Sequence, residues 1–487
     1  FPTRRSSDLK TGDDGRARRV FWELSSIGTE WRLFQSTVTK TALYSGLEHL
    51  LWWGDRGTGL ARKQGIVAWG RRGIAVSQMS DLPCVVYLGE PFDSNMTAII
   101  PKDQNSLEAL LAFCSSNVFQ PSVHQIDQSI KPTNSSFEKV PFDLSHWQNV
   151  AAKKYPHGLP KPFSNDPTQW LFTGHPNGAD QPLQVAVARL LGYRWPRQTG
   201  SNFPDCPALG PDGLEKLADD DGIVCIPSVR GELPAVERLR ELLAAAYGRD
   251  WKAAQEAELL RASGSEAGDL EEWLRNEFFA QHCIIFHQRP FIWHIWDGRK
   301  RDGFHALVNY HKLCEGNGKG RKLLESLTYS YLGDWITRQR DGVKRGEGGA
   351  EDRLAAALEL QNRLKAIAEG EPPFDIFVRW KPLHHQPIGW NPDINDGVRL
   401  NIRPFLASDL PNGRTGAGIL RFKPNIKWGK DRGKEPHRPK AEYPWFWGWD
   451  EQSVDFMGGK TFDGNRWNDC HYSNSVKQAA CSGLIRK

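Results

Sequence analysis

The chain lacks the features that would place it in a membrane or outside the cell. No apolar run approaches the roughly 18 to 20 residues that cross a bilayer. The first twenty residues are charged and have no apolar block, so we expect neither a membrane segment nor a signal peptide. The eight cysteines are scattered without close pairing, which is typical of a reducing compartment rather than of a disulfide framework. We therefore predict a cytoplasmic protein.

The sequence also lacks the motifs of several enzyme classes. It has no Gly-x-Ser-x-Gly nucleophile elbow, no P-loop, and no Gly-x-Gly-x-x-Gly sequence after a predicted strand. Carboxylates occur throughout the chain without a distinctive pair. A carbohydrate-active protein that uses the 20 tryptophans as sugar platforms would therefore have no catalytic anchor.

A zinc centre is the one metal site that the sequence suggests. His311 and Cys314 are three residues apart, but His294 and His305 have no close partner in the sequence. Tight zinc sites contain closely spaced ligand pairs. We therefore favour buried, hydrogen-bonded histidines over a metal site.

The composition is that of a globular protein with several domains. Of the 487 residues, 39% are hydrophobic and 25% are charged, and a chain of this length forms about two to four domains. We predict an α+β fold in four parts: a mixed α/β domain (10–150), a connector (151–232), a mainly helical domain (233–370) and an irregular, basic, aromatic C-terminal region (371–487). Residues 1–9 resemble a translated sequencing adapter and fit no helix or strand pattern, so we exclude them from the fold.

Periodicity predicts individual elements inside these parts. Short runs of β-branched and aromatic residues between Gly, Pro and Asp predict strands, and leucines at helical spacing predict helices. The predicted strands are 19–24, 31–38, 65–69, 73–76, 84–88, 97–100 and 135–140. The predicted helices are 106–115, 119–128, 181–192, 234–247, 250–263, 268–283, 321–340 and 350–369.

One segment of the first domain has the chemistry of a DNA contact. Residues 66–76 contain two apolar runs separated by Gly-Arg-Arg-Gly, which predicts a β-hairpin with two arginines at its tip. Arginine binds phosphates and guanine edges, and glutamine can bind adenine. A surface hairpin with solvated charges is an equally acceptable interpretation. The candidate DNA-binding residues here are Arg62, Lys63, Arg71, Arg72, Ser77 and Gln78.

A second basic stretch lies near the C-terminus. Residues 395–440 contain eleven Lys and Arg against four Asp and Glu, and within 421–434 the cations alternate with Phe422 and Trp428. This combination suits phosphate contacts and base stacking. A loop packed on the helical domain, with its lysines in water, explains the pattern equally well. The candidates are Arg421, Lys423, Lys427, Lys430 and Arg432.

Several long, Trp-rich strings stand out in the sequence. They are 68–84, 182–196, 289–298, 306–313, 327–336, 391–405 and 462–472. Together they resemble the C-terminal halves of large adenine-specific DNA methyltransferases, which are the single-chain type II restriction-modification methylases and their relatives in the BREX and DISARM phage-defence systems. The resemblance covers most of residues 20–480.

The resemblance implies a two-part enzyme that acts on double-stranded DNA. An N-terminal domain that binds S-adenosylmethionine methylates an adenine extruded from the duplex, and the C-terminal part recognises the target sequence. The family's Asn-Pro-Pro-Tyr/Phe motif and its Gly-rich cofactor loop are absent here, since residues 391–394 are Asn-Pro-Asp-Ile. We therefore expect no catalytic or cofactor-binding residues in this chain.

Two hypotheses follow from this resemblance. In the first, the chain is the target-recognition part of a methyltransferase whose catalytic domain lies outside this sequence. In the second, it is a stand-alone specificity or scaffold subunit that partners a separate methylase. Double-stranded DNA is the expected partner in both, and other proteins of the defence system are further candidates.

Overall fold

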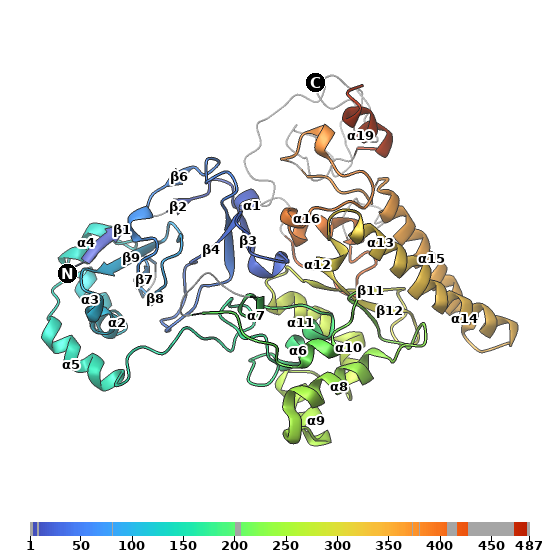
Figure 1. Cartoon of the computed structure of the whole chain (residues 1–487), viewed down its shortest axis with the longest axis horizontal. Coiled ribbons are helices and arrows are strands. Elements are labelled where there is room, and N and C mark those ends of the chain that lie inside the picture. Colours follow the sequence, from blue (N-terminus) through green and yellow to red (C-terminus); the bar gives the residue numbers. More distant parts are fainter. Residues whose placement is uncertain are drawn as a thin grey trace. The chain divides into compact units, whose positions relative to one another are not determined.

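A computed structural model of the chain shows two compact units. It describes residues 3–6, 9–79, 81–199, 206–372, 374–378, 380–406, 416–426 and 472–484. Unit 1 comprises Phe1–Phe21, Ser26–Thr173 and Trp195–Leu209, and unit 2 comprises Trp22–Ser25, Gly174–Arg194 and Gly210–Lys487 (Figure 1). The expected connector, 151–232, is thus divided between the two units.

Unit 1 is built around three antiparallel sheets. The largest has the strand order β1-β9-β7-β8, the second β3-β5-β4, and the smallest β2-β6. The strands are β1 Thr3–Ser6, β2 Leu9–Lys10, β3 Arg18–Val20, β4 Trp31–Phe34, β5 His49–Trp52, β6 Arg62–Lys63, β7 Gly73–Ser77, β8 Cys84–Tyr87 and β9 Met96–Pro101.

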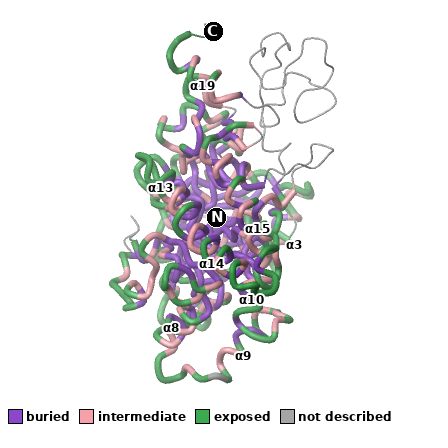
Figure 2. The backbone as a smooth tube through the Cα atoms, turned by 90° about the vertical axis from the view of Figure 1, so that its right-hand side faces the viewer, coloured by how far each residue is buried: buried purple, intermediate pink, exposed green. Residues whose placement is uncertain are grey.

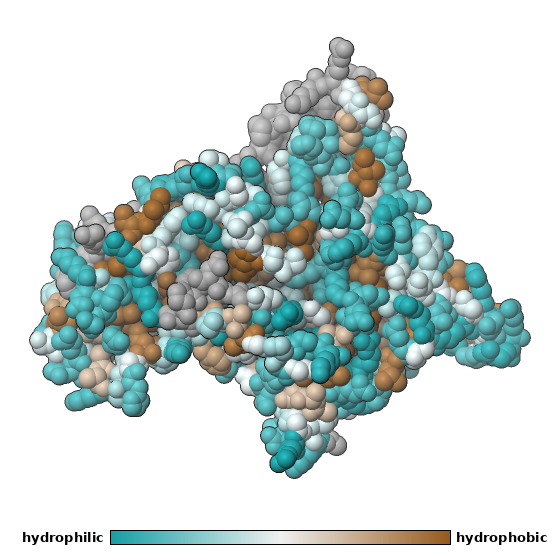
Figure 3. All heavy atoms as spheres, viewed as in Figure 1, coloured by the Kyte–Doolittle hydropathy of each residue, from teal (hydrophilic) through white to brown (hydrophobic). Residues whose placement is uncertain are grey.

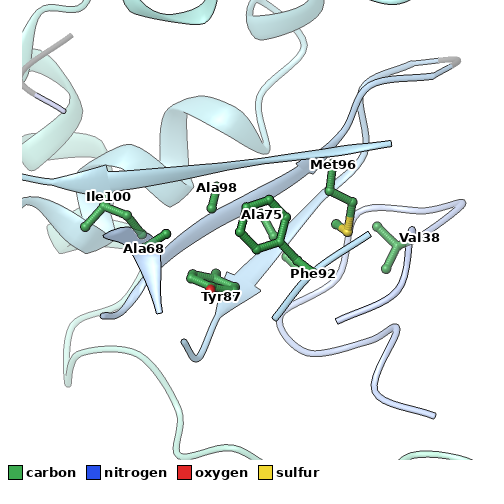
Figure 4. Close-up of a cluster of buried hydrophobic side chains, with 9 residues drawn as sticks. Val38, Ala68, Ala75, Tyr87, Phe92, Met96, Ala98 and Ile100 are labelled. Atoms are coloured by element: carbon green, nitrogen blue, oxygen red, sulfur yellow. The ribbon is translucent and has the colours of Figure 1, made fainter. Parts of the chain in front are cut away.

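The main core of unit 1 lies on the largest sheet. Strand β7 is a central strand between β8 and β9 and is buried along its whole length. An apolar cluster packs on the sheet, and helix α2 also contacts β7. The side chains of Ala75, Tyr87, Phe92 and Met96 pack together there, and Ala68 reaches the same cluster from a neighbouring turn (Figure 4). The apolar run of residues 73–76 in β7 is typical of a strand that is buried on both faces of its sheet.

The helices of unit 1 surround these sheets. They are α1 Asp14–Ala17, α2 Leu107–Cys114, α3 Phe119–His124, α4 Asn134–Lys139, α5 Leu144–Lys154 and α7 Pro196–Thr199. Helix α2 confirms the predicted helix 106–115 and buries seven of its eight residues. Within the segment 1–9 that we expected to lie outside the fold, β1 pairs with β9 and Leu9 is buried.

Two predictions for unit 1 fail on local geometry. Residues 135–140 form helix α4 rather than a strand, because Asp127 accepts hydrogen bonds from the Thr133 N–H and the Ser136 hydroxyl and fixes a turn at its start. Residues 66–76 form no hairpin. Gly70 turns the chain with φ +73°, but Gly73, which was expected in the turn of the hairpin, is already the first residue of β7. This strand pairs with β8 and β9, and a Cβ atom at Gly73 would approach a backbone oxygen of β9 to 2.4 Å.

Unit 2 is mainly helical around a small antiparallel sheet with the order β10-β12-β11. The strands are β10 Ile223–Cys225, β11 Ile292–Trp296 and β12 His305–Asn309. The helices are α6 Pro182–Leu190, α8 Ala235–Tyr247, α9 Ala253–Ala262, α10 Leu270–Asn276, α11 Phe278–Ile285, α12 Tyr310–Leu313, α13 Lys319–Ser326, α14 Leu332–Lys344, α15 Ala350–Glu369, α16 Val398–Asn401, α17 Arg403–Leu406 and α19 Asn474–Cys481.

Helix α15 illustrates how periodicity forms this unit. Its buried residues, Ala357, Leu360, Leu364 and Ile367, recur three and four positions apart, which places them on one face. Gly370 ends the helix with φ +71°, the left-handed conformation that glycine adopts readily. The helix packs against α14, and the outward residues of peripheral helices such as α13 are exposed (Figure 2).

The predicted α+β fold is confirmed by this combination of small antiparallel sheets and many helices. Among the described residues, no helix has both the length and the apolar character that crossing a membrane requires. On the face drawn in Figure 3, hydrophobic side chains emerge in small patches between hydrophilic ones.

Candidate nucleic-acid interface

A strongly basic segment crosses the surface of unit 1. Residues 56–72, called the basic segment below, contain five cationic side chains and no Asp or Glu. Arg56, Lys63 and Arg71 are exposed, whereas Arg62 and Arg72 are partly buried. No carboxylate among the described residues forms an ion pair with the three exposed cations. Their charge is therefore available to an external anion.

The fold holds both ends of the basic segment in place. Strand β6 pairs with β2, with Arg62 opposite Lys10. The preceding turn is fixed by Asp55, whose carboxylate accepts hydrogen bonds from the N–H groups of Gly57 (2.8 Å) and Gly59 (3.2 Å). The Lys63 ammonium donates to the Arg56 carbonyl at 3.3 Å. Asp55, the acid that directly precedes the segment in the sequence, is thus bound to backbone N–H groups.

An aromatic cluster lies against the same segment. The rings of Trp53 and Trp69 meet edge to face, with centroids 5.3 Å apart. The exposed guanidinium of Arg32 lies 4.7 Å from the Trp53 ring centre and 6.0 Å from that of Trp69. A cation over an aromatic face is held by about 0.5–1 kcal/mol at an exposed site. The cluster therefore adds a positioned cation beside the basic segment.

The turn between Lys63 and Arg71 is apolar, and it exposes its larger side chains rather than its smallest one. Its residues, Ile66–Ala68, form one 3₁₀ turn, called the apolar turn below. Ile66 is 55% exposed and Val67 64% exposed, whereas Ala68 is 1% exposed. The two large side chains thus face solvent while the smallest is buried. A patch of this kind lies among hydrophilic residues in the region of β2 and β6 (Figure 3).

A buried acid lies directly behind this turn. The carbonyl of Gly89 accepts a hydrogen bond from the Gly70 N–H at 2.9 Å, and the next residue, Glu90, is 3% exposed. Neither carboxylate oxygen of Glu90 has a well-formed hydrogen bond to a described residue. Burial raises the pKa of Glu90 to about 7, and the nearby N–H groups of Glu90 and Leu88 offset only part of that effect.

The two candidates that follow the expected hairpin do not reach the surface. The Ser77 hydroxyl donates to the Val38 carbonyl (3.0 Å) and accepts from the Val38 N–H (2.9 Å). The Gln78 amide donates to the Pro132 carbonyl (3.1 Å) and to Asn134 Oδ1 (2.7 Å). Both side chains are at most 5% exposed. Their assignment as base-reading residues is corrected here, because they bind the protein's own backbone and side chains.

The C-terminal candidates are only partly described. Arg421 packs over the Trp296 ring at 4.5 Å and donates to the Arg275 carbonyl (3.1 Å) and to Asn276 Oδ1 (3.1 Å). Burial lowers the pKa of Arg421. Arg421 thus contributes to the packing of unit 2, while Lys423 is exposed. Lys427, Lys430 and Arg432 lie outside the described residues.

The histidines that suggested zinc are engaged in hydrogen bonds within unit 2. His294 Nε2 lies 2.9 Å from His305 Nδ1, and His305 Nε2 lies 2.8 Å from the Arg299 carbonyl. His311 Nε2 lies 2.7 Å from the Trp22 carbonyl. Burial lowers the pKa of His305 to about 3 and that of His311 to about 4. The part of the chain that the structure describes contains no group of three or more potential ligands arranged around a metal.

Sequence reasoning missed the residues that complete the surface. Arg32 and Trp53 lie outside the predicted hairpin of residues 66–76, and Ile66 and Val67 were assigned to one of its strands. Counting charges alone would have found the basic segment, because 17 consecutive residues with five cations and no acid are visible in the sequence. The exposure of the apolar turn required the structure.

Comparison with known proteins adds no assignment to this surface. No protein-family model matches the chain, and no curated protein matches it significantly.

Proposed function

We propose that unit 1 binds double-stranded DNA through the basic segment and serves as the target-recognition part of an adenine-specific DNA methyltransferase. The observation that supports DNA binding is the set of exposed cations without acidic partners, Arg56, Lys63 and Arg71, beside the Arg32–tryptophan cluster. Exposed lysines and arginines bind the phosphates of a duplex, and arginine also contacts base edges.

The methyltransferase context rests on the sequence resemblance. In that context the chain works in the cytoplasm as part of a restriction-modification or phage-defence system. S-adenosylmethionine then binds to a separate catalytic domain, because the family's Gly-rich cofactor loop has no counterpart in this sequence. Methyl transfer is a property of the assembled enzyme. A stand-alone specificity subunit would use the same surface and obtain its methylase as a partner protein.

Fluorescence anisotropy with a 30-bp duplex at two salt concentrations tests DNA binding. We expect the wild-type affinity to fall as salt rises, and the variant Lys63→Ala/Arg71→Ala to bind more weakly. The slope of log K against log salt should decrease by about 1.8, since each lost phosphate contact contributes about 0.9.

A matched control separates this effect from a general loss of charge. Lys153→Ala/Lys161→Ala also removes two exposed cations of unit 1, one in the last turn of α5 and one in the loop that follows it, rather than in the basic segment. It should bind like the wild type. Equal losses in both variants would show that the attraction is unspecific, and absence of salt-dependent binding would refute the proposal.

Selection from a random duplex pool tests target recognition. Enrichment of one motif that contains an adenine would support a methyltransferase recognition domain. A pool that retains its starting composition, although the protein binds it, would indicate sequence-independent DNA binding instead.

A further inference from the structure

The apolar turn exposes two large side chains although its own backbone is anchored in the core. Ala68 belongs to the cluster on the largest sheet (Figure 4), and Trp69 packs against that cluster and a second one formed by Leu9, Phe34 and Leu51. The chain thus enters the core immediately after Ile66 and Val67 and leaves both outside.

Hydrogen bonds fix the shape of the turn. The Ala68 N–H donates to the Gly65 carbonyl (2.9 Å), the Trp69 N–H to the Ile66 carbonyl (3.1 Å), and the Arg71 N–H to the Ala68 carbonyl (3.2 Å). Gly65 enters the turn with φ +88°, a conformation that glycine adopts at little cost. The exposed pair is therefore presented in one defined conformation. A prearranged surface loses less conformational entropy when it binds.

The charges around the pair indicate what it would meet. Lys63 precedes the turn by three residues and Arg71 follows Val67 by four, and the basic segment contains no acid. An exposed apolar turn that two exposed cations flank in the sequence complements a surface that is anionic at its edges and apolar within. Duplex DNA has this arrangement, because its phosphates flank a stack of base pairs. Several DNA-binding proteins insert apolar side chains between base steps in this way.

We propose that Ile66 and Val67 form a wedge that inserts between stacked base pairs of the DNA held by Lys63 and Arg71. This inference rests on the proposed function and adds a mechanism to it: the protein deforms the duplex as it binds. No bond is made or broken. The wedge separates neighbouring base pairs, and the cations keep the flanking phosphates in place.

Binding to two duplexes of equal length tests the wedge. One is fully paired, and the other has two adjacent mismatches at its centre, so that its bases are already partly unstacked. We expect the wild type to bind the mismatched duplex about tenfold more tightly, because unstacking a paired step consumes binding energy. In Ile66→Ser/Val67→Ser the preference should disappear while the salt dependence remains.

Control variants distinguish the wedge from a general effect of removing apolar surface. Val118→Ser/Ile130→Ser replaces another exposed valine and isoleucine of unit 1, with exposures of 45% and 80%, and should keep the tenfold preference. Lys63→Ala/Arg71→Ala should weaken binding to both duplexes and leave their ratio unchanged. Circular dichroism verifies that each variant is folded.

The outcomes separate failure of the wedge from failure of DNA binding. Salt-dependent wild-type binding with equal affinity for both duplexes refutes the wedge and leaves the proposed function intact. Absence of binding to either duplex refutes both. Binding to phosphatidylserine vesicles that requires Ile66 and Val67, without a preference between duplexes, would assign the turn to a membrane surface and overturn the proposal.

Discussion

Replacement of Glu90 by glutamine should remove the contribution of this carboxyl group to the pH dependence of the stability of unit 1. Glu90 is 3% exposed, and burial raises its pKa from 4.5 to about 7. The folded state therefore binds a proton more tightly than the unfolded state does. The stabilisation that this provides is complete below pH 4.5, and it is lost as the pH rises through 7.

The expected size follows from the two pKa values. Between pH 5 and pH 8 the proton linkage of one group with these values changes the free energy of unfolding by about 2–3 kcal/mol. Glutamine has nearly the same shape and does not titrate. The difference in free energy between wild type and Glu90→Gln should therefore shift by about 2–3 kcal/mol across this range, whatever constant cost the amide introduces.

Urea unfolding at pH 5, 6, 7 and 8, followed by tryptophan fluorescence, measures this difference. Glu30→Gln is the control, because it removes one exposed carboxyl group of the same unit. Parallel curves for wild type and Glu90→Gln would show that the carboxyl is ionised in the folded protein, and would refute the description of its site.

Three further predictions concern other parts of the chain. Burial lowers the pKa of His282 and of His305 to about 3, so unit 2 should lose stability as pH falls from about 6.5 towards 3, by up to about 4 kcal/mol for each imidazole; an unchanged free energy of unfolding between pH 7 and 4 would contradict this. Lys477→Ala should destabilise unit 2 by about 3–5 kcal/mol because Lys477 pairs with Asp375 at 3.2 Å and both side chains are fully buried; hydrogen exchange in α19 should then accelerate, and unchanged protection would count against the pair. Gly73→Ala should lower the melting temperature, because its Cβ would lie 2.4 Å from a β9 backbone oxygen; a melting temperature equal to that of the wild type would show that β7 can shift.

Helices of unit 2 were largely predictable from the sequence. The predicted ranges 234–247 and 350–369 correspond to α8 and α15 within one residue at each end. Their leucines recur at helical spacing, and Gly248 and Gly370 follow their last turns. Local spacing determines both the buried face and the end of such helices, so no distant contact is needed to place them.

The candidate site was less predictable because contacts distant in sequence decide which side chains face outward. Ser77 is buried through a partner 39 residues away, and Gln78 through one 56 residues away. Arg421 is held by a carbonyl 146 residues away. A local pattern shows that such residues are polar, but it does not show which of them are buried and hydrogen-bonded to distant parts of the chain. The exposed cations of the basic segment were identifiable because charges without acidic neighbours seldom become buried.

The apolar turn also has a consequence for how the molecule behaves at high concentration. Exposed β-branched residues promote association between copies, and neighbouring charges of one sign oppose it. Lys63 and Arg71 flank Ile66 and Val67 in the sequence. The same cations that are proposed to hold DNA therefore repel the corresponding cations of a second copy and oppose contact between two apolar turns. At 1 M salt the screening length falls to about 3 Å, and this repulsion disappears. The chain should therefore stay dispersed in dilute buffer and self-associate as salt is added.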